Sequence, residues 1–100
     1  MLAAMDVPLT RRHVLIYEYV TENVVERRAP HRAGHIGLIR EWMKDGRIMM
    51  GGALGDPPTG AHIVFASDSP ADAEAFAAKD PYVSSGLVTS WRVEAWNVVD

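Results

Sequence analysis

The chain has 100 residues and no cysteine; 48% of the residues are hydrophobic, 23% are charged, and the net charge is −3. This length suits a single domain, and the charged share is that of an ordinary folded protein, which excludes a disordered chain. The lack of cysteine excludes disulfide frameworks, thiolate zinc sites and cysteine nucleophiles. The acidic balance argues against a general nucleic-acid binder.

The first residues do not follow the order of a secretory signal. A signal has positive charge first and about 7–15 apolar residues next, whereas here Arg11 and Arg12 follow Asp6. We expect a flexible leader over residues 1–11, with Met1 or Met5 as the start, and one domain over residues 12–100. No segment approaches the ~20 apolar residues that span a bilayer, so we expect no membrane contact and a cytoplasmic location.

The first half of the chain predicts a strand and a helix. Residues 13–20 are rich in β-branched and aromatic side chains, which is typical of a strand. Proline is tolerated in the first turn of a helix, so the proline that opens residues 30–44 predicts a helix there. His35, Ile39 and Trp42 recur at the spacing of one helix face, which we expect to be packed.

The second half predicts three strands and a second helix. Residues 47–51 and 61–66 have strand composition, and the glycine- and proline-rich residues 52–60 predict a turn between them. A serine–proline pair opens a helix at residue 70, and an Asp-Pro pair ends it at residue 80. Residues 87–99 alternate as a long last strand.

The order βαββαβ predicts a ferredoxin-like fold of the α+β class, a four-stranded antiparallel sheet with two helices on one face. The other face of such a sheet is bare. Tyrosine, tryptophan, methionine and valine alternate onto both faces here, and a bare apolar face is unfavourable in water. We therefore predict a homodimer through the open sheet faces, which together form a dimeric α/β barrel.

Positive charge is concentrated near residue 30. Residues 1–50 have eight basic and six acidic side chains, whereas residues 51–100 have two and seven. The cluster consists of Arg27, Arg28, His31, Arg32 and His35. Such a run is usually a solvated helix face. The alternative is a positive pocket rim that attracts an anionic substrate.

Three segments carry a resemblance to a known family. They are Arg28 with Arg32-Ala33-Gly34-His35-Ile36, Asp45-Gly46-Arg47-Ile48 with Gly51-Gly52, and Asp80-Pro81-Tyr82-Val83 with Gly86-Leu87. In this order and spacing they resemble the YciI-like (YCII-related) family of the dimeric α/β-barrel group, over residues 13–99. The sequence departs from the family at Ala53, where proline is usual after the glycine.

The resemblance implies a catalytic pair in a pocket. In the family, a histidine on the first helix and the aspartate of the Asp-Pro-Tyr segment are the proposed pair, and these match His35 and Asp80. The arginines seven and three residues before the histidine match Arg28 and Arg32.

Elementary chemistry supports the same residues. A carboxylate such as Asp80 beside His35 would fix the tautomer of the imidazole and raise its basicity, which suits acid–base catalysis near neutral pH. Arg28 and Arg32 lie on nearly the same helix face and could hold a substrate carboxylate or phenolate. Tyr82 would line the pocket and offer its hydroxyl. The alternative is a half-buried histidine bonded to a structural carboxylate, with Tyr82 as packing.

Other kinds of site find little support. Ser84 and Ser85 lack the strand–turn–helix elbow of a nucleophilic serine. His31 and His35 have a spacing that can chelate zinc, but no third ligand follows. The glycines of residues 51–55 do not form a nucleotide-binding pattern. We expect no metal and no cofactor.

The resemblance implies a small cofactor-independent enzyme of the YciI type, and a site with a base but no nucleophile suits lyase or isomerase chemistry. We expect lyase or isomerase chemistry on a small anionic or phenolic compound, with no nucleic-acid partner. Two alternatives stay open. One is a non-catalytic small-ligand-binding or dimeric interaction module; the other is a cofactor-free monooxygenase of the same fold group.

Overall fold

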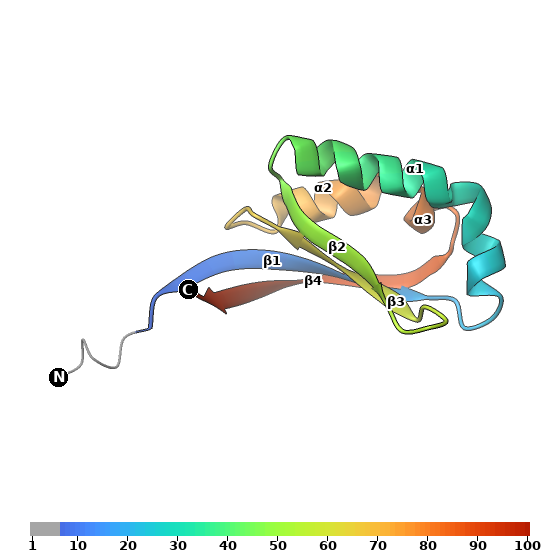
Figure 1. Ribbon diagram of the computed structural model, residues 1–100, viewed down its shortest axis with the longest axis horizontal. Coiled ribbons are helices and arrows are strands. Elements are labelled where there is room, and N and C mark those ends of the chain that lie inside the picture. The colour runs from blue at the N-terminus through green and yellow to red at the C-terminus, as the bar shows by residue number, and fades with distance from the viewer. Residues whose placement is uncertain (1–6) are drawn as a thin grey trace.

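The computed structural model of the chain describes residues 7–100. Strands and helices follow one another along the chain in the order that Figure 1 colours from blue to red. Their bounds are β1 Leu9–Tyr19, α1 Val24–Lys44, β2 Ile48–Leu54, β3 Gly60–Phe65, α2 Ala71–Lys79, α3 Pro81–Ser84 and β4 Val88–Val99.

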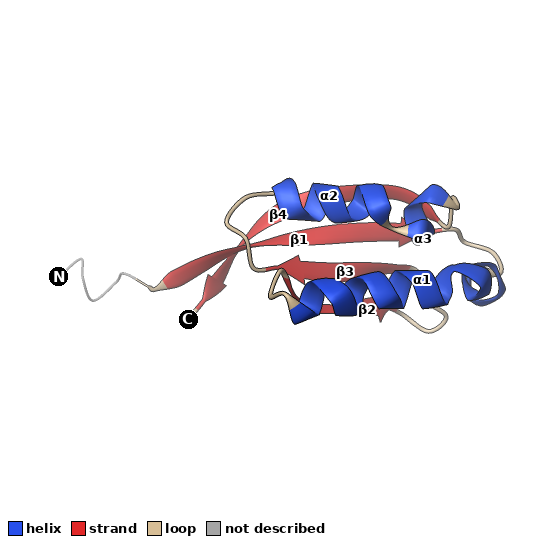
Figure 2. Cartoon of the chain, turned by 90° about the horizontal axis from the view of Figure 1, so that it is seen from above, coloured by secondary structure: helices blue, strands red, loops and turns tan. Residues whose placement is uncertain are grey.

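The strands form one sheet in the order β2-β3-β1-β4, and every neighbouring pair is antiparallel. All the helices lie on the same face of this sheet, and the other face is uncovered (Figure 1). Seen from above, α1 runs along β2 and β3, while α2 runs along β1 and β4 (Figure 2). The predicted ferredoxin-like α+β fold is confirmed.

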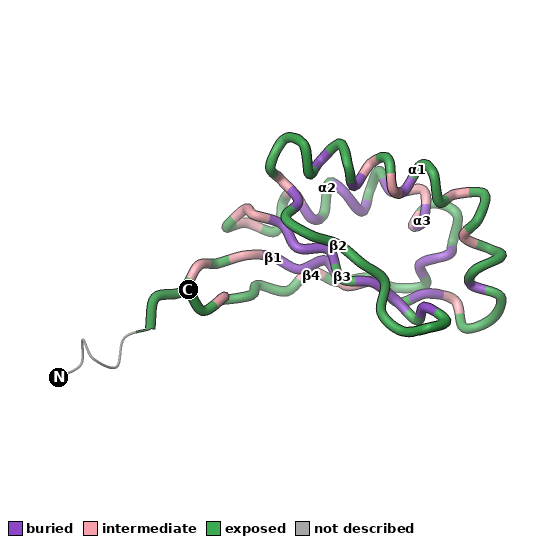
Figure 3. Tube along the Cα trace, in the orientation of Figure 1, coloured by how far each residue is buried: buried purple, intermediate pink, exposed green. Residues whose placement is uncertain are grey.

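The core fills the layer between the helices and the sheet, where the buried segments of the trace face one another (Figure 3). Side chains alternate across a strand, so Leu15 of β1 and Ile63 and Phe65 of β3 all point toward the helices and are 1% exposed or less. Helix α1 adds Trp42 and helix α2 adds Phe76 to the same layer.

The first helix begins earlier than predicted, at Val24 and not at Pro30. Asn23 adopts a left-handed conformation, φ 54°, and turns the chain from the strand into the helix. Pro30 lies inside α1, where it cannot donate to the carbonyl of Glu26; one lost bond bends a helix without ending it. The first turns of α1 are angled against the rest (Figure 1).

The first strand also begins earlier than predicted. Residues 9–11, which we expected in the leader, belong to β1 and pair with β4, Leu9 opposite Val99. The leader prediction for residues 1–6, Met5 included, lies outside the described residues. No helix in the described part of the chain is long and apolar enough to cross a membrane.

The turn between β2 and β3 is shorter than predicted, because β2 continues to Leu54, which pairs with Gly60. Gly60 is required where it stands: a Cβ there would lie 2.1 Å from the carbonyl oxygen of Tyr17. The close approach of β3 to β1 therefore fixes how far the hairpin extends.

The end of the second helix creates a short helix that the sequence analysis did not predict. α2 ends before Asp80, as the Asp-Pro pair predicts, and Pro81 then occupies the first position of α3. The Asp80 carboxylate accepts the backbone N–H of Tyr82 at 2.9 Å and so caps α3. At the start of α2 the N-cap is Pro70 and not the predicted Ser69, because the helix begins one residue later, at Ala71; Ser69 Oγ accepts the N–H of Ala71 at 3.2 Å.

Candidate active site

His35 of α1 and Asp80 of the α2–α3 junction meet in the buried layer. His35 Nδ1 lies 2.9 Å from each carboxylate oxygen of Asp80, although 45 residues separate them in the sequence. His35 is 5% exposed and Asp80 is fully buried. The two residues named from the sequence as a pair are therefore hydrogen-bonded to each other.

Asp80 accepts two further hydrogen bonds that hold it in place. The Tyr17 hydroxyl of β1 donates to Oδ2 at 2.7 Å, and the Tyr82 N–H donates to Oδ1. Burial, and then the charge and hydrogen bond of Asp80, raise the pKa of Tyr17 above its ordinary value, so its hydroxyl stays protonated and remains a donor. Asp80 is thus oriented by three donors from three segments.

The acceptor role of Asp80 determines the tautomer of His35. Nδ1 carries the proton that Asp80 accepts, which leaves Nε2 of the neutral ring as an acceptor. The ring is stacked on Tyr82, with centroids 3.8 Å apart and planes 6° apart. A histidine held by a carboxylate on one nitrogen and free on the other can take or give a proton at Nε2.

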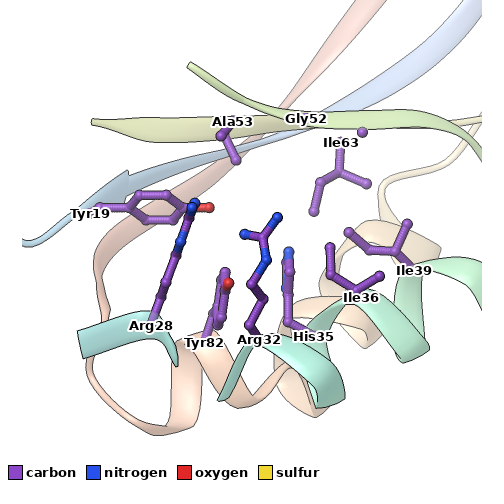
Figure 4. A pocket seen from close by; sticks show the side chains of 12 residues that line it. Tyr19, Arg28, Arg32, His35, Ile36, Ile39, Gly52, Ala53, Ile63 and Tyr82 are labelled. Carbon is purple, nitrogen blue, oxygen red and sulfur yellow. The ribbon is translucent and has the colours of Figure 1, made fainter. Parts of the chain in front are cut away.

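A cavity of about 250 Å³ opens beside this pair (Figure 4). It lies between α1, α3 and the strands β2 and β3, and His35 rises from α1 toward it. The lining residues are Tyr19, Arg28, Arg32, His35, Ile36, Ile39, Gly51, Gly52, Ala53, Ala61, Ile63 and Tyr82. The volume is below the roughly 300–1,000 Å³ of pockets for drug-sized ligands, so the space suits a small molecule.

Arg28 and Arg32 extend into the region of the cavity from successive turns of α1 (Figure 4). Within residues 7–100, neither guanidinium has an acidic partner or a side-chain hydrogen bond. Two cations without counter-ions at one cavity attract a negatively charged ligand. Both arginines therefore lie where the sequence analysis expects them.

The opposite wall of the cavity is apolar and partly without side chains. Ile63 of β3 faces Ile36 and Ile39 of α1, and β2 contributes Gly51 and its neighbours (Figure 4). A Cβ at Gly51 would lie 3.5 Å from Ile63 and would occupy this wall. Ala53, the departure from the family pattern, also belongs to the lining. The wall is suited to the hydrophobic part of a ligand.

The other histidine and the serines of this region lie elsewhere. His31 lines a separate depression with Arg27, Ser85 and Leu87. Ser84 Oγ donates to the carbonyl of Pro81 within α3. In residues 7–100, no group of three or more histidine, aspartate or glutamate side chains is arranged to hold a metal ion.

Two tyrosines of the site were missed by sequence reasoning. Tyr17 holds Asp80, and Tyr19 lines the cavity, 6.0 Å from the Tyr82 ring in an edge-to-face contact. The available signal was the alternation of β1, which places Tyr17 on the same face as Leu15. That signal separates the two faces of a strand, but it does not tell which tyrosines will meet the aspartate of a distant turn.

The fold and this cavity define a ferredoxin-like α+β domain with a histidine–aspartate pair at a basic pocket. Residues 13–97 match the YCII-related domain, and the chain belongs to this family. No curated protein sequence matches it.

A solved structure with the same fold is 5-chloro-2-hydroxyhydroquinone dehydrochlorinase from Burkholderia phenoliruptrix AC1100, in complex with 2,5-dihydroxybenzoquinone. Its TM-score is 0.66 and its sequence identity 23%, over 84% of this chain and 92% of that chain. At this identity the likeness establishes the shared fold.

Proposed function

We propose that the protein is a small-molecule enzyme that moves a proton on an anionic or phenolic compound, with lyase or isomerase chemistry. His35 is the general acid–base, and Asp80 orients it. Arg28 and Arg32 bind the anionic end of the substrate, and Tyr82 forms part of the pocket wall. The observation that carries the proposal is the His35–Asp80 hydrogen bond at 2.9 Å beside a cavity that two unpaired arginines also line.

The proposed step uses only groups of this chain. Nε2 of His35 takes a proton from a substrate carbon, and the electrons of the broken C–H bond form a C=C bond. In a lyase the leaving group departs from the neighbouring atom with its own bonding electrons. In an isomerase the histidine returns the proton to a different carbon of the same molecule.

The comparisons support chemistry of this kind. The enzyme of the solved structure named above is a dehydrochlorinase of a hydroxyhydroquinone, in complex with a dihydroxybenzoquinone. Dehydrochlorination is an elimination, and both compounds carry hydroxyl groups that ionise readily. Small hydroxylated rings with a leaving group are therefore the first compounds to test.

The test is turnover of a panel of chlorinated and hydroxylated phenols and quinols by the wild type and by His35→Gln. Because positioned acid–base groups contribute about 10²–10⁴-fold, kcat/KM should fall by about a hundredfold or more. The matched control is His31→Gln, four residues earlier on α1 and outside the cavity, which should leave kcat/KM unchanged. Equal activity of wild type and His35→Gln would remove His35 from the mechanism.

The same panel separates the alternatives. Uptake of O₂ in step with substrate loss would indicate the cofactor-free monooxygenase. Tight binding of panel members without conversion of any of them would indicate the non-catalytic ligand-binding module. The cytoplasmic location stays a prediction from the sequence.

We also propose a homodimer through the uncovered face of the sheet. Met50 and Trp96 lie on that face and are 60% and 47% exposed, beside Val14 of β1 and Val64 of β3, which are themselves 8% and 7% exposed. A patch of this kind favours association with a second copy. Light scattering should show twice the chain mass at micromolar concentration and the monomer mass for Met50→Lys; a monomeric wild type would contradict the proposal.

A further inference from the structure

The hydroxyl of Tyr82 is the one buried side-chain polar atom in residues 7–100 without a hydrogen-bond partner. Tyr82 is 1% exposed, so the hydroxyl has left water without gaining a partner. An unpaired buried donor of this kind costs about 1–3 kcal/mol of stability. A phenylalanine would pack equally well here without that cost, so the packing of the ring does not account for the hydroxyl.

The ring has little freedom to turn the hydroxyl elsewhere. Its face is stacked on His35, its edge contacts Tyr19, and its backbone N–H is bonded to Asp80. In Figure 4 the hydroxyl lies between the side chains of Arg28 and Arg32. The structure therefore fixes this donor at the basic end of the cavity.

A second tyrosine at this end is also held as a donor. Tyr19 lines the cavity, and burial, followed by the nearby Tyr82 and Asp80, raises its pKa to about 12. Its hydroxyl is therefore protonated at any physiological pH. Arg28 and Arg32 line the same cavity, and their positive charges act on the pKa of this hydroxyl in the opposite direction.

The side chains that line the cavity include no carboxylate to match these donors. Neither aspartate nor glutamate is among the lining side chains, and the ring nitrogen His35 Nε2 is an acceptor. A ligand with acceptor oxygens at the arginine–tyrosine end and a reacting hydrogen near His35 would match these groups. The rings of Tyr19, His35 and Tyr82, with the isoleucines opposite, suit a flat conjugated body between them.

We infer that the hydroxyls of Tyr82 and Tyr19 complete, with Arg28 and Arg32, an oxyanion subsite for the anionic oxygen of a small conjugated ligand. The inference rests on the proposed function and deepens it. Charge that develops on a conjugated oxygen, when His35 removes a proton from the adjoining carbon framework, is stabilised by donors already in place. Tyr82 then contributes to specificity, since its hydroxyl can donate a hydrogen bond to the anionic oxygen and a neutral ligand without such an oxygen leaves it unpaired.

The test is direct binding at about pH 9 by isothermal calorimetry with three probes of one ring size: 4-nitrophenolate, 4-nitrobenzoate and neutral nitrobenzene. The two anionic arms distinguish a phenolate oxygen from a carboxylate as the occupant. The wild type should bind at least one anion about tenfold or more tighter than nitrobenzene. Tyr82→Phe should weaken the binding of that anion by about tenfold to a hundredfold, because a hydrogen bond to a charged group is lost. The affinity for nitrobenzene should not change.

Thermal unfolding of the ligand-free protein provides the second readout. Tyr82→Phe removes an unpaired hydroxyl, so its melting temperature should equal or exceed that of the wild type. Tyr17→Phe is the matched control, since the same substitution there breaks the bond to Asp80 and should lower the melting temperature. Unchanged anion affinity in Tyr82→Phe, or no preference of the wild type for either anion, would overturn the subsite.

These outcomes are separate from those of the proposed function. If the Tyr82-dependent preference for an anion is found but no compound is converted, the subsite stands and the enzymatic proposal fails. If His35-dependent turnover is found but Tyr82→Phe binds both anions like the wild type, the enzymatic proposal stands and the subsite fails.

Discussion

The two ends of the layer between the helices and the sheet are both built from aromatic side chains, and the cavity described above lies at one of them. At one end, Phe76 of α2 packs edge-to-face on Trp42, 5.4 Å away, and on Phe65, 5.8 Å away. At the other end, His35 stacks on Tyr82 beside buried Asp80. His35 and Trp42 are seven residues apart on α1, about 10 Å along its axis.

The difference between the ends lies in the polar atoms of the rings. At the Phe76 end the phenylalanine rings have no polar atoms and pack against the Trp42 ring, on which Arg47 is also stacked at 3.6 Å. The Tyr82 end carries hydroxyls and an imidazole that need partners, and those partners come from a carboxylate and, by our inference, from a ligand. One helix–sheet layer thus provides both a core and a site.

The largest expected effect is a loss of stability at the Phe76 end of the layer, the packed end. Phe76→Ala should lower the free energy of unfolding by about 3–5 kcal/mol, because the fully buried ring leaves a cavity between Trp42 and Phe65. Chemical denaturation measures this change. Val25→Ala, at a half-exposed position of α1, is the control and should change it by less than about 0.5 kcal/mol. A small effect of Phe76→Ala would mean that the packed end is not the stabilising end.

The next largest effect is a loss of activity at the Tyr82 end of the layer, the polar end. Asp80→Asn keeps the side-chain size but replaces one acceptor oxygen by a donor, so His35 loses the partner that selects its tautomer. We expect kcat/KM to fall by about a hundredfold or more. The pH profile of kcat/KM and a two-dimensional NMR spectrum of the imidazole nitrogens report the tautomer. An unchanged tautomer together with full activity would contradict the orienting role.

A smaller effect is expected from Tyr17→Phe. Its hydroxyl donates to Asp80 at 2.7 Å in a buried place, so the free energy of unfolding should fall by about 1–3 kcal/mol. Chemical denaturation of Tyr17→Phe and Tyr82→Phe compares a paired with an unpaired hydroxyl. The free energy of unfolding should fall in Tyr17→Phe and stay the same or rise in Tyr82→Phe. An equal fall in the free energy of unfolding of both variants would show that hydrogen-bond pairing does not distinguish the two hydroxyls.

The smallest effect is alkaline destabilisation of the polar end. Burial first of all raises the pKa of Tyr19 from 10.0 to about 12 in the folded protein. Between about pH 10 and pH 12 the unfolded chain therefore loses this proton before the folded chain does. The unfolded state binds fewer protons, so this contribution to stability, complete below about pH 10, is lost as pH rises through about 12.

Denaturation midpoints at about pH 8, 10 and 11 measure this loss. Tyr19→Phe should show a shallower decline with pH than the wild type, since one raised pKa is removed. The Phe76 end has no titrating ring and contributes nothing to the decline. Identical declines in the two proteins would contradict the role of Tyr19.

Much of the fold was predictable because local patterns carry it. The strand composition of residues 61–66, the alternation of residues 87–99, the Ser-Pro start of α2 and the Asp-Pro stop before α3 each depend on neighbouring residues alone. The predicted helix start at Pro30 was wrong for the same reason. The local preference of proline is for a first turn, but α1 tolerates Pro30 in its interior because the residues before it are already helical. Leu9 joins β1 because it pairs with Val99, a contact that no local pattern contains.

The sequence by itself determined the order of the elements except α3, and the inward face of α1 that carries His35. It also identified the site candidates, which are His35, Asp80, Arg28, Arg32 and Tyr82. Only the tertiary structure decided that Tyr17 holds Asp80 from 63 residues away, and that the Tyr82 hydroxyl is buried without a partner. The physical reason is that periodicity and capping depend on residues a few positions apart. Hydrogen bonds in a core depend on how strands and helices distant in the chain pack together.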